Sequence, residues 1–211
     1  MKFKKQTLFS LAIAASVLAS CSSKQTENTE SNAALDNIMT RTSIRAYTAD
    51  SISKENIETM LRAAMAAPSA GNKQPWRFVV IETRATLDSI GANFGSMKMA
   101  SQAPLGIVVC GDLEATFPEE GRDYWIEDTS AAMENLLLAA HSIGLGAVWC
   151  GIYPMSDRVQ AFSEMLSLPE NIIPMGVAII GHPQSAQEPK DKWNPEYVHY
   201  ESWKKSGAKG F

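Results

Sequence analysis

The densest group of hydrogen-bonding side chains in this sequence lies between two prolines, in the stretch Pro68-Ser-Ala-Gly-Asn-Lys-Gln-Pro-Trp76. Prolines stiffen the backbone, and hydroxyl and amide groups on a stiff loop suit a ligand with many hydrogen-bonding atoms. The loop lies between a segment with helical apolar spacing and the β-like run Phe78-Val-Val-Ile81. A structural interpretation is equally open from these residues alone, because Trp76 can fill the core beneath an Ω-type loop.

Two further groups of residues carry cations that could bind phosphate. In Arg41-Thr-Ser-Ile-Arg45, two arginines flank two hydroxyls. Arginine forks bind phosphate oxygens in pairs, and hydroxyls complete the shell. The simpler interpretation, which these residues alone favour, is a helix C-terminus whose cations interact with the helix dipole. The second group, Pro189-Lys-Asp-Lys192, is a solvated charge cluster unless the tail folds back and brings Lys190 and Lys192 near Arg41.

The N-terminus has the three parts of a secretory signal. Three lysines within the first five residues precede an apolar run over 8–19 and the sequence Leu18-Ala-Ser-Cys21, and the run is too short for a permanent membrane span. The sequence Leu18-Ala-Ser-Cys21 resembles the bacterial lipobox, which implies cleavage before Cys21 and lipidation of its sulfur. The lipid would anchor the protein in the bacterial cell envelope, on the periplasmic or outer-membrane face. An ordinary signal peptide with an incidental cysteine is the alternative. We expect residues 1–20 to be the lipoprotein signal peptide and the polar residues 21–32 to be a flexible tether.

The charge balance excludes a nucleic-acid binder. The chain carries 19 Lys and Arg against 23 Asp and Glu, and loss of residues 1–20 removes three lysines and no acids, which moves the formal net charge from −4 to −7. A nucleic-acid-binding protein would need a basic surface. No repeat or second boundary divides residues 33–211, and this length is sufficient for one domain.

The cysteines and histidines do not predict a metal site. Once Cys21 carries lipid, Cys110 and Cys150 remain, both inside apolar strand-like runs. A disulfide between them is allowed outside the cytoplasm, although two unpaired core thiols are the preferred interpretation. The three histidines are scattered, and no pair of residues has the spacing of zinc ligands, so no metal ligand is predicted.

Apolar spacing and turn residues predict an α+β or mixed α/β domain in which helices cover a sheet. The predicted helices cover residues 33–39, 53–67, 85–94, 129–143 and 157–166, and the predicted strands cover residues 77–82, 105–110, 146–152 and 173–180. Ser53 is a good N-cap, with Ile52 and Ile57 placed as a hydrophobic staple. Met65 belongs to the apolar face of the same helix. The helix over 129–143 is apolar almost all round, which indicates a domain centre or a subunit interface.

Together these pieces resemble the nitroreductase family of FMN-dependent oxidoreductases over about residues 35–203. The segments that carry the resemblance by their order and spacing are Arg41–Arg45, Pro68–Trp76, Ala103–Asp112, Gly144–Ile152 and Gly181–Pro183, the last followed by Pro189–Lys192. The resemblance implies a nitroreductase-like α+β fold with a central mixed β-sheet flanked by helices. It also implies an intertwined homodimer that holds two FMN molecules at the subunit interface.

The resemblance further implies which residues bind the cofactor. These residues are Arg41, Thr42, Ser43, Arg45, Pro68, Ser69, Asn72, Gln74, Trp149, Cys150, Gly151, Ile152, Lys190 and Lys192. Arg41 and Ser43 would reach the phosphate or ribityl chain together with the two lysines. Arg45 would lie at the pyrimidine edge, where positive charge stabilises the anionic reduced ring and raises its potential. The loop residues would come from the partner subunit, with Asn72 at the flavin edge, and residues 149–152 would lie against the isoalloxazine ring.

The function that the resemblance implies is a two-step reaction. A donor of the NAD(P)H type reduces FMN and leaves, and an electron-poor acceptor such as a nitroaromatic or a quinone then enters. No side chain is predicted to act as a catalytic group. A membrane electron carrier is an alternative donor, because an envelope lipoprotein lies outside the soluble nicotinamide supply. Phe94, Tyr124 and Trp125 are candidates to line the acceptor pocket, although at least one of them is expected to be plain packing.

Two features depart from the family pattern. Many relatives have arginine where this chain has Lys192, and lysine supplies charge without a planar fork. The loop over 95–104 is short, which indicates an open pocket or a compact branch of the family. Two alternatives to the enzyme are a lipid-anchored flavin- or ligand-binding protein without turnover and a dehalogenase-type branch of the family. Retention of both arginines and of the full Pro68–Trp76 loop argues against the protein without turnover.

Overall fold

The structure, a computed structural model, describes residues 32–203. The predicted signal peptide, the predicted lipidation residue Cys21 and nearly all of the predicted tether therefore lie outside the described residues. Between residues 32 and 203, no helix combines the length and the apolar character needed to cross a bilayer.

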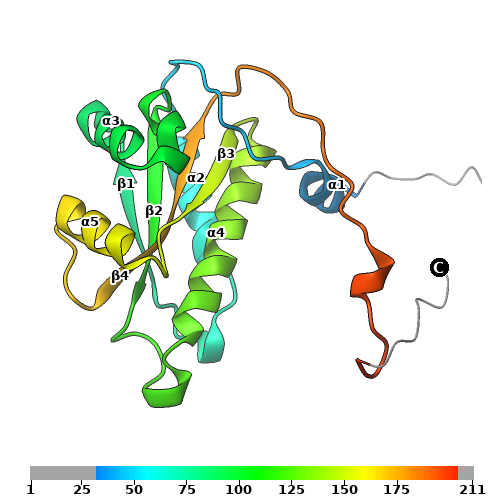
Figure 1. Ribbon diagram of the computed structural model, residues 1–211. Helices are drawn as coiled ribbons and strands as arrows, with labels where there is room; N and C mark the ends of the chain where they lie inside the picture. Colours follow the sequence, from blue (N-terminus) through cyan, green and yellow to red (C-terminus); the bar gives the residue numbers. More distant parts are fainter. Residues whose placement is uncertain (1–31, 204–211) are drawn as a thin grey trace, which may run out of the picture. The chain divides into compact units, whose positions relative to one another are not determined.

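A four-stranded antiparallel sheet forms the centre of the domain (Figure 1). Its strands are β1 (Trp76–Ile81), β2 (Leu105–Asp112), β3 (Gly146–Gly151) and β4 (Ile172–Gly181), and they lie in the order β1-β2-β4-β3. Every residue of β2 is buried, and β4 is buried from Pro174 to its end, as expected for apolar strands that are covered on both faces. The two edges of this sheet are therefore β1 and β3.

Helices cover both faces of the sheet. The α-helices are α1 (Ala33–Thr40), α2 (Lys54–Met65), α3 (Arg84–Asn93), α4 (Tyr124–Ser142) and α5 (Ser156–Leu166), and short 3₁₀ helices cover Ala70–Asn72, Gly95–Ser101, Glu119–Gly121 and Pro195–Tyr197. Figure 1 shows α2 and α4 on one face and α3 and α5 on the other. Two hydrophobic cores follow this division, one with Met60 of α2 and Met133 of α4, the other with Leu87 of α3 and Phe162 of α5. The predicted α+β fold, a central sheet flanked by helices, is confirmed.

The start of α2 follows the polar and apolar signals in the sequence. The Ser53 hydroxyl oxygen accepts a hydrogen bond from the backbone N–H of Asn56 (3.2 Å), which confirms the predicted N-cap. Ile52 and Ile57 are both buried in the same core, as a hydrophobic staple requires. A cap of this kind stabilises a helix by about 1 kcal/mol.

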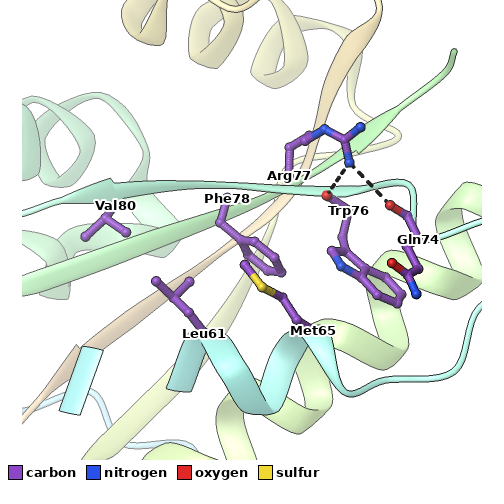
Figure 2. Close-up of a pocket in the computed structure, with 7 residues that line it drawn as sticks. All are labelled: Leu61, Met65, Gln74, Trp76, Arg77, Phe78 and Val80. Atoms are coloured by element: carbon purple, nitrogen blue, oxygen red, sulfur yellow. Dashed lines mark hydrogen bonds between the residues drawn. The ribbon is translucent and has the colours of Figure 1, made fainter. Parts of the chain in front are cut away.

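The end of α2 differs from the prediction. Met65 was expected on the buried face, but this side chain is 52% exposed. Figure 2 shows the reason, because Leu61 and Met65 of α2 face Phe78 of the edge strand β1 across an open groove of about 430 Å³. No described strand continues the sheet beyond β1. Side chains at this edge therefore have a neighbouring strand, β2, on one side and none on the other.

The helix α4 begins earlier than the sequence indicates. Its first residue is Tyr124, whereas the predicted start is Thr129. Asp128 lowers the intrinsic helix propensity of this region, whereas Asp123 precedes the helix as its N-cap. Burial of Trp125, which is 3% exposed, shows that tertiary packing decides the helical state of the first turn.

An extended segment pairs with the outer edge of β3. Ser43 forms an isolated parallel bridge with Ala147, and the N–H of Ile44 donates to the Ala147 carbonyl (3.1 Å). The bridge lies outside the four strands, which all pair antiparallel, so the sheet is antiparallel and not mixed as predicted. The Tyr47 hydroxyl lies 2.5 Å from the carbonyl oxygen of Ile44 and 2.8 Å from that of Ile179. Burial raises the pKa of Tyr47, which keeps the hydroxyl protonated as a donor.

Two glycines make room for this segment. A Cβ at Gly146 would lie 2.7 Å from the side chain of Ile44, and a Cβ at Gly181 would lie 2.8 Å from the side chain of Tyr47. Carbon atoms do not pack at such distances without displacing a neighbour. Glycine at both positions therefore allows residues 43–47 to approach the backbone of β3 and β4 closely.

Gly146→Ala should therefore destabilise the domain by about 1–3 kcal/mol, because the new methyl group collides with Ile44 and pushes residues 43–47 away from β3. Urea unfolding followed by circular dichroism measures this change in the free energy of unfolding. Gly95→Ala is the matched control, since a Cβ at Gly95 meets no heavy atom within 4 Å. Equal destabilisation by the two substitutions would contradict this account of the packing.

Candidate functional site

The first part of the predicted site is the guanidinium of Arg41, which is held against α4. Three side-chain contacts dock the end of α1 on this helix, and they join Asn37 Nδ2 to Leu138 O (3.0 Å), Thr40 Oγ1 to His141 Nε2 (3.0 Å) and Arg41 Nε to Glu134 Oε1 (3.2 Å). In this ion pair Nε of Arg41 faces the Glu134 carboxylate, and the arginine side chain is 19% exposed. The planar fork of a guanidinium suits two oxygens of one phosphate. Beside them, Thr42 is half-buried and Ser43 is exposed.

The outer edge of β3 forms the second part of the predicted site. The carbonyl of Ala147 faces this edge, where it accepts from Ile44. Because backbone groups alternate along a strand, those of Trp149 and Gly151 face the same edge. Trp149 is 36% exposed, and a Cβ at Gly151 would meet no heavy atom within 4 Å. A planar ligand can therefore approach the backbone of Gly151 closely.

Two guanidinium groups reach this edge from different elements. Arg45, from the segment beside β3, is exposed, and its Nη1 lies 3.5 Å from the carbonyl oxygen of Ser43. Arg158, in the first turn of α5, donates from Nη1 to the carbonyl of Gly151 (2.8 Å). Burial raises the pKa of the Cys150 thiol, and the positive charges of Arg45 and Arg158 oppose that rise. The end of β3 is therefore a region of positive charge.

The other two predicted contacts on this strand point inward. Cys150 is 7% exposed and Ile152 is fully buried, and the N–H of Ile152 already donates to the Met175 carbonyl (3.1 Å). Cys150 and Cys110 are both free thiols. Because β4 lies between their strands and they pair with Pro174 and Val177, three residues apart on β4, they are roughly 14 Å apart, beyond the reach of a disulfide. Within the described part of the chain, no cluster of three or more His, Cys, Asp or Glu is placed to hold a metal ion.

The loop from Pro68 to Trp76 has both a structural and an exposed polar part. Trp76 is 6% exposed and packs in the core with α2 and α4, so its indole fills the core as the structural interpretation predicts. The polar side chains stay near the surface and bond to one another. The N–H of Gln74 donates to Ser69 Oγ (3.0 Å), and Gln74 Nε2 donates to Asn72 Oδ1 (2.9 Å). These amide and hydroxyl groups are therefore ordered before any ligand binds.

The backbone of this loop is also fixed. Gly71, Asn72 and Gln74 adopt left-handed conformations with φ of 53°, 55° and 51°, which persist only where the surroundings define them. Asp128 of α4 provides one such contact, because its Oδ1 accepts from the N–H of Ala70 (2.8 Å). Asp128 is 4% exposed, and its Oδ2 has no hydrogen-bond partner among residues 32–203. The sequence gives no sign of this role, since one acid in a helix does not identify a distant loop.

Within one chain the two parts of the predicted site do not meet. The Arg41–Arg45 segment lies outside β3, whereas the Pro68–Trp76 loop leads into β1 at the opposite edge. Four inter-strand spacings separate these positions, which is roughly 19 Å. Lys190 and Lys192 are exposed in the chain after β4.

The three aromatic residues predicted as pocket candidates have different surroundings. Phe94 packs against Phe162 of α5, with ring centroids 5.0 Å apart. Trp125 is buried and meets the ring of Tyr153 edge-on at 4.9 Å. Both are therefore packing residues in this chain, although Trp125 and Tyr153 also line an open cavity of about 440 Å³ near the end of β3. Tyr124 is 46% exposed and is available to a ligand.

Comparison with known proteins relates the sequence to one family. The sequence pattern of the Nitroreductase family matches residues 38–97 and 91–182. These ranges contain Arg41–Arg45, Pro68–Trp76 and the end of β3, but not the two tail lysines. An Archaeoglobus fulgidus protein named "Putative NADH dehydrogenase/NAD(P)H nitroreductase" is 44% identical over 170 residues, which cover 79% of this chain and 96% of that protein.

Solved structures show the same relationship in three dimensions. A crystal structure of the same name from Bacteroides thetaiotaomicron has a TM-score of 0.77 and 46% identity, with 82% of this chain and 99% of that chain covered. The NADPH:FMN oxidoreductase from Vibrio harveyi, solved with NAD+, has a TM-score of 0.74 and 26% identity, with 82% of this chain and 78% of that chain covered. The similarity therefore extends over the sheet and both helical layers.

His141 gives this site a pH dependence. Burial lowers the pKa of its imidazole, and the charge of Arg41 lowers it further, so the unfolded chain takes up the proton first as the pH falls. The stabilisation should be complete above the unfolded pKa of about 6.5 and should be lost progressively below it. His141→Asn keeps a polar partner for Thr40 without titrating. Urea unfolding from about pH 7 to about pH 5 should show a shallower loss of stability in this variant; an unchanged pH slope would contradict the assignment.

Proposed function

Because this chain belongs to the nitroreductase family, we propose that it is an FMN-dependent oxidoreductase that takes hydride or electrons from a donor of the NAD(P)H type and passes them to an electron-poor acceptor. The observation that carries this proposal is the outer edge of β3, where Arg158 donates to the Gly151 carbonyl and the charges of Arg45 and Arg158 both act on the neighbouring Cys150. An edge of this kind suits a planar ring that becomes anionic on reduction.

The residues of the chain fit FMN as the cofactor. The terminal nitrogens of Arg41 and the hydroxyls of Thr42 and Ser43 suit its phosphate. The exposed indole of Trp149 and the space beside Gly151 suit its ring. FMN is also named for relatives, among them the Vibrio harveyi NADPH:FMN oxidoreductase and an FMN-dependent nitroreductase from Clostridium difficile. FMN is therefore the cofactor that we assign to this chain.

The contribution of the protein to the reaction is position and charge. FMN, when bound, supplies the hydride and electron transfer itself. Arg41 binds the phosphate end and is in turn held by Glu134 of α4, which fixes where the cofactor lies along the helix. Arg45 places positive charge at the end of β3, which favours the anionic reduced state. Neither step requires a side chain to form a covalent bond.

We infer that the working unit is a homodimer. The two groups of predicted site residues lie at opposite edges of one sheet, so a complete site needs the loop Pro68–Trp76 of a second copy. Apolar side chains of α1 and the tail are also exposed in the single chain, with Ile38 at 52%, Met39 at 70% and Tyr197 at 79%. Large apolar side chains that gather at a surface indicate an interaction site.

The cellular location and the reaction partners are part of the same proposal. The lipobox-like sequence Leu18–Cys21 supports a lipid anchor on Cys21 and a place in the bacterial cell envelope. The polar residues 21–32 would then tether residues 33–211 to the membrane. Nitroaromatics and quinones are the proposed acceptors. The donor is a nicotinamide or, for an enzyme outside the cytoplasm, a membrane electron carrier.

The test of this function uses the chain produced from Ser22 onward. Its absorbance spectrum shows whether FMN is retained or can be reconstituted. Nicotinamides, a quinol and candidate acceptors are then added without oxygen while the flavin absorbance is followed. Bleaching by a donor and recovery by an acceptor are expected. A chain that cannot bind FMN would overturn the proposal, and a flavin that every donor leaves oxidised would favour a binding protein without turnover.

Arg41→Ala should weaken FMN binding by about 10- to 100-fold, because a charge-assisted contact to the phosphate contributes about 1.5–3 kcal/mol. Lys192→Ala should cost less, since its exposed side chain is a point charge without a planar fork. Fluorescence titration with FMN measures both dissociation constants. Riboflavin, which lacks the phosphate, is the control and should bind both variants as it binds the original chain. Equal losses of FMN affinity would show that the two contacts are ranked wrongly.

The shared site predicts complementation in mixed dimers. A dimer of one Arg41→Ala chain and one Asn72→Ala, Gln74→Ala chain should contain one intact site and one site with both defects. Differently tagged chains allow the mixed dimer to be purified, and its FMN stoichiometry is then titrated. One tight site per mixed dimer is expected, against none in either homodimer. If both sets of residues came from the same chain, the mixed dimer would have no tight site.

A further inference from the structure

Arg158 lies where α5 begins, and its side chain reaches back to the preceding strand. The helix starts at Ser156, shortly after β3 ends at Gly151. The backbone N–H of Arg158 bonds to the Met155 carbonyl (3.0 Å), while Nη1 donates to the Gly151 carbonyl (2.8 Å). The guanidinium of Arg158 therefore links the first turn of α5 to the last residue of β3 across the connecting turn.

This hydrogen bond fixes one peptide unit at the outer edge of β3. The Gly151 carbonyl faces the same edge as the Ala147 carbonyl, which accepts from Ile44. The nitrogen of that peptide unit belongs to Ile152 and donates to the Met175 carbonyl (3.1 Å). Because both polar atoms of the peptide are bonded, the backbone beside the open space at Gly151 has a defined orientation.

The charge of Arg158 is not neutralised by a carboxylate. Among residues 32–203, the arginines that form ion pairs are Arg41, Arg62, Arg77 and Arg84. Arg45 and Arg158 form none, and Asp157, which neighbours Arg158 in sequence, makes no ion pair with it. Both free charges act on Cys150, where they oppose the rise in thiol pKa that burial causes. They therefore reinforce each other at the end of β3.

We propose that Arg158 is a positioning residue that orients the Gly151 backbone toward the flavin and, together with Arg45, makes the flavin easier to reduce. This inference rests on the proposed function, since it requires the ring to lie at the end of β3. Negative charge on the reduced ring is stabilised by nearby cations that lack a counter-ion. The site then includes α5 as a third element beside the Arg41–Arg45 segment and β3.

The test compares Arg158→Gln, which removes the charge, with Arg158→Lys, which keeps it. In Arg158→Gln the reduced cofactor should bind about tenfold less tightly relative to the oxidised cofactor, which equals a midpoint potential lower by about 30 mV for a two-electron couple. Arg158→Lys should keep the original ratio within about threefold. Arg62→Gln is the control, because it removes an exposed arginine that pairs with Glu58 on α2. Equilibration with reference dyes measures the potentials. If the midpoint potential of the flavin in Arg158→Gln equals that of the unsubstituted protein, the proposal is wrong.

A second measurement needs no flavin and separates this inference from the proposed function. Alkylation of Cys150 by a small thiol reagent is followed at fixed pH by peptide mapping in the FMN-free chain. Removal of the Arg158 charge should slow it about threefold, since less thiolate is present. Cys110, fully buried on β2, is the internal control. An unchanged Cys150 rate would overturn the inference even if FMN binds, whereas a slower rate without FMN binding would place the failure in the proposed function.

Discussion

The candidate site depends on the backbone pairing between Ile44 and Ala147. This contact holds the 43–47 segment beside β3, so that Arg41 reaches back to Glu134 of α4 while Arg45 acts at the end of the strand. The two glycines and the buried Tyr47 all serve this pairing, because they provide the space and the hydrogen bonds that it needs. Without it, Arg45 would lie on a solvated segment with no fixed relation to the sheet, and Arg41 would be held by the contacts of α1 with α4 and by its ion pair with Glu134.

Features that are local in the sequence can be predicted from it. The cap and staple of α2 lie within a few residues, and β2 and β4 are continuous apolar runs, so both strands follow from composition, although each extends one or two residues beyond its predicted limits. The same holds for the candidate site, since Arg41–Arg45 and Pro68–Trp76 are each one short segment with a concentrated set of polar groups. Trp76 shows the limit of such reasoning, because the sequence allows both roles and only its burial assigns it to the core.

Features that depend on the fold around them are not visible in the sequence. Arg158 and Asp128 are ordinary charged residues of helices, and their importance comes from distant backbone atoms that they contact. Met65 has the spacing of a core residue, yet it is exposed because the sheet ends beneath it. The start of α4 is a similar case, since burial of Trp125 outweighs the weak helix propensity of its neighbours.

The left-handed residues of the Pro68–Trp76 loop have a consequence for how affinity and folding stability are divided. Each left-handed non-glycine residue costs on the order of 1–2 kcal/mol, and here two of them, Asn72 and Gln74, are held in place by hydrogen bonds within the loop. The conformational entropy of these side chains is lost when the chain folds, so a ligand need not lose it again on binding. Substitutions that relax this backbone would therefore make the domain more stable and the loop a poorer binder, a stability–activity trade-off confined to a few residues.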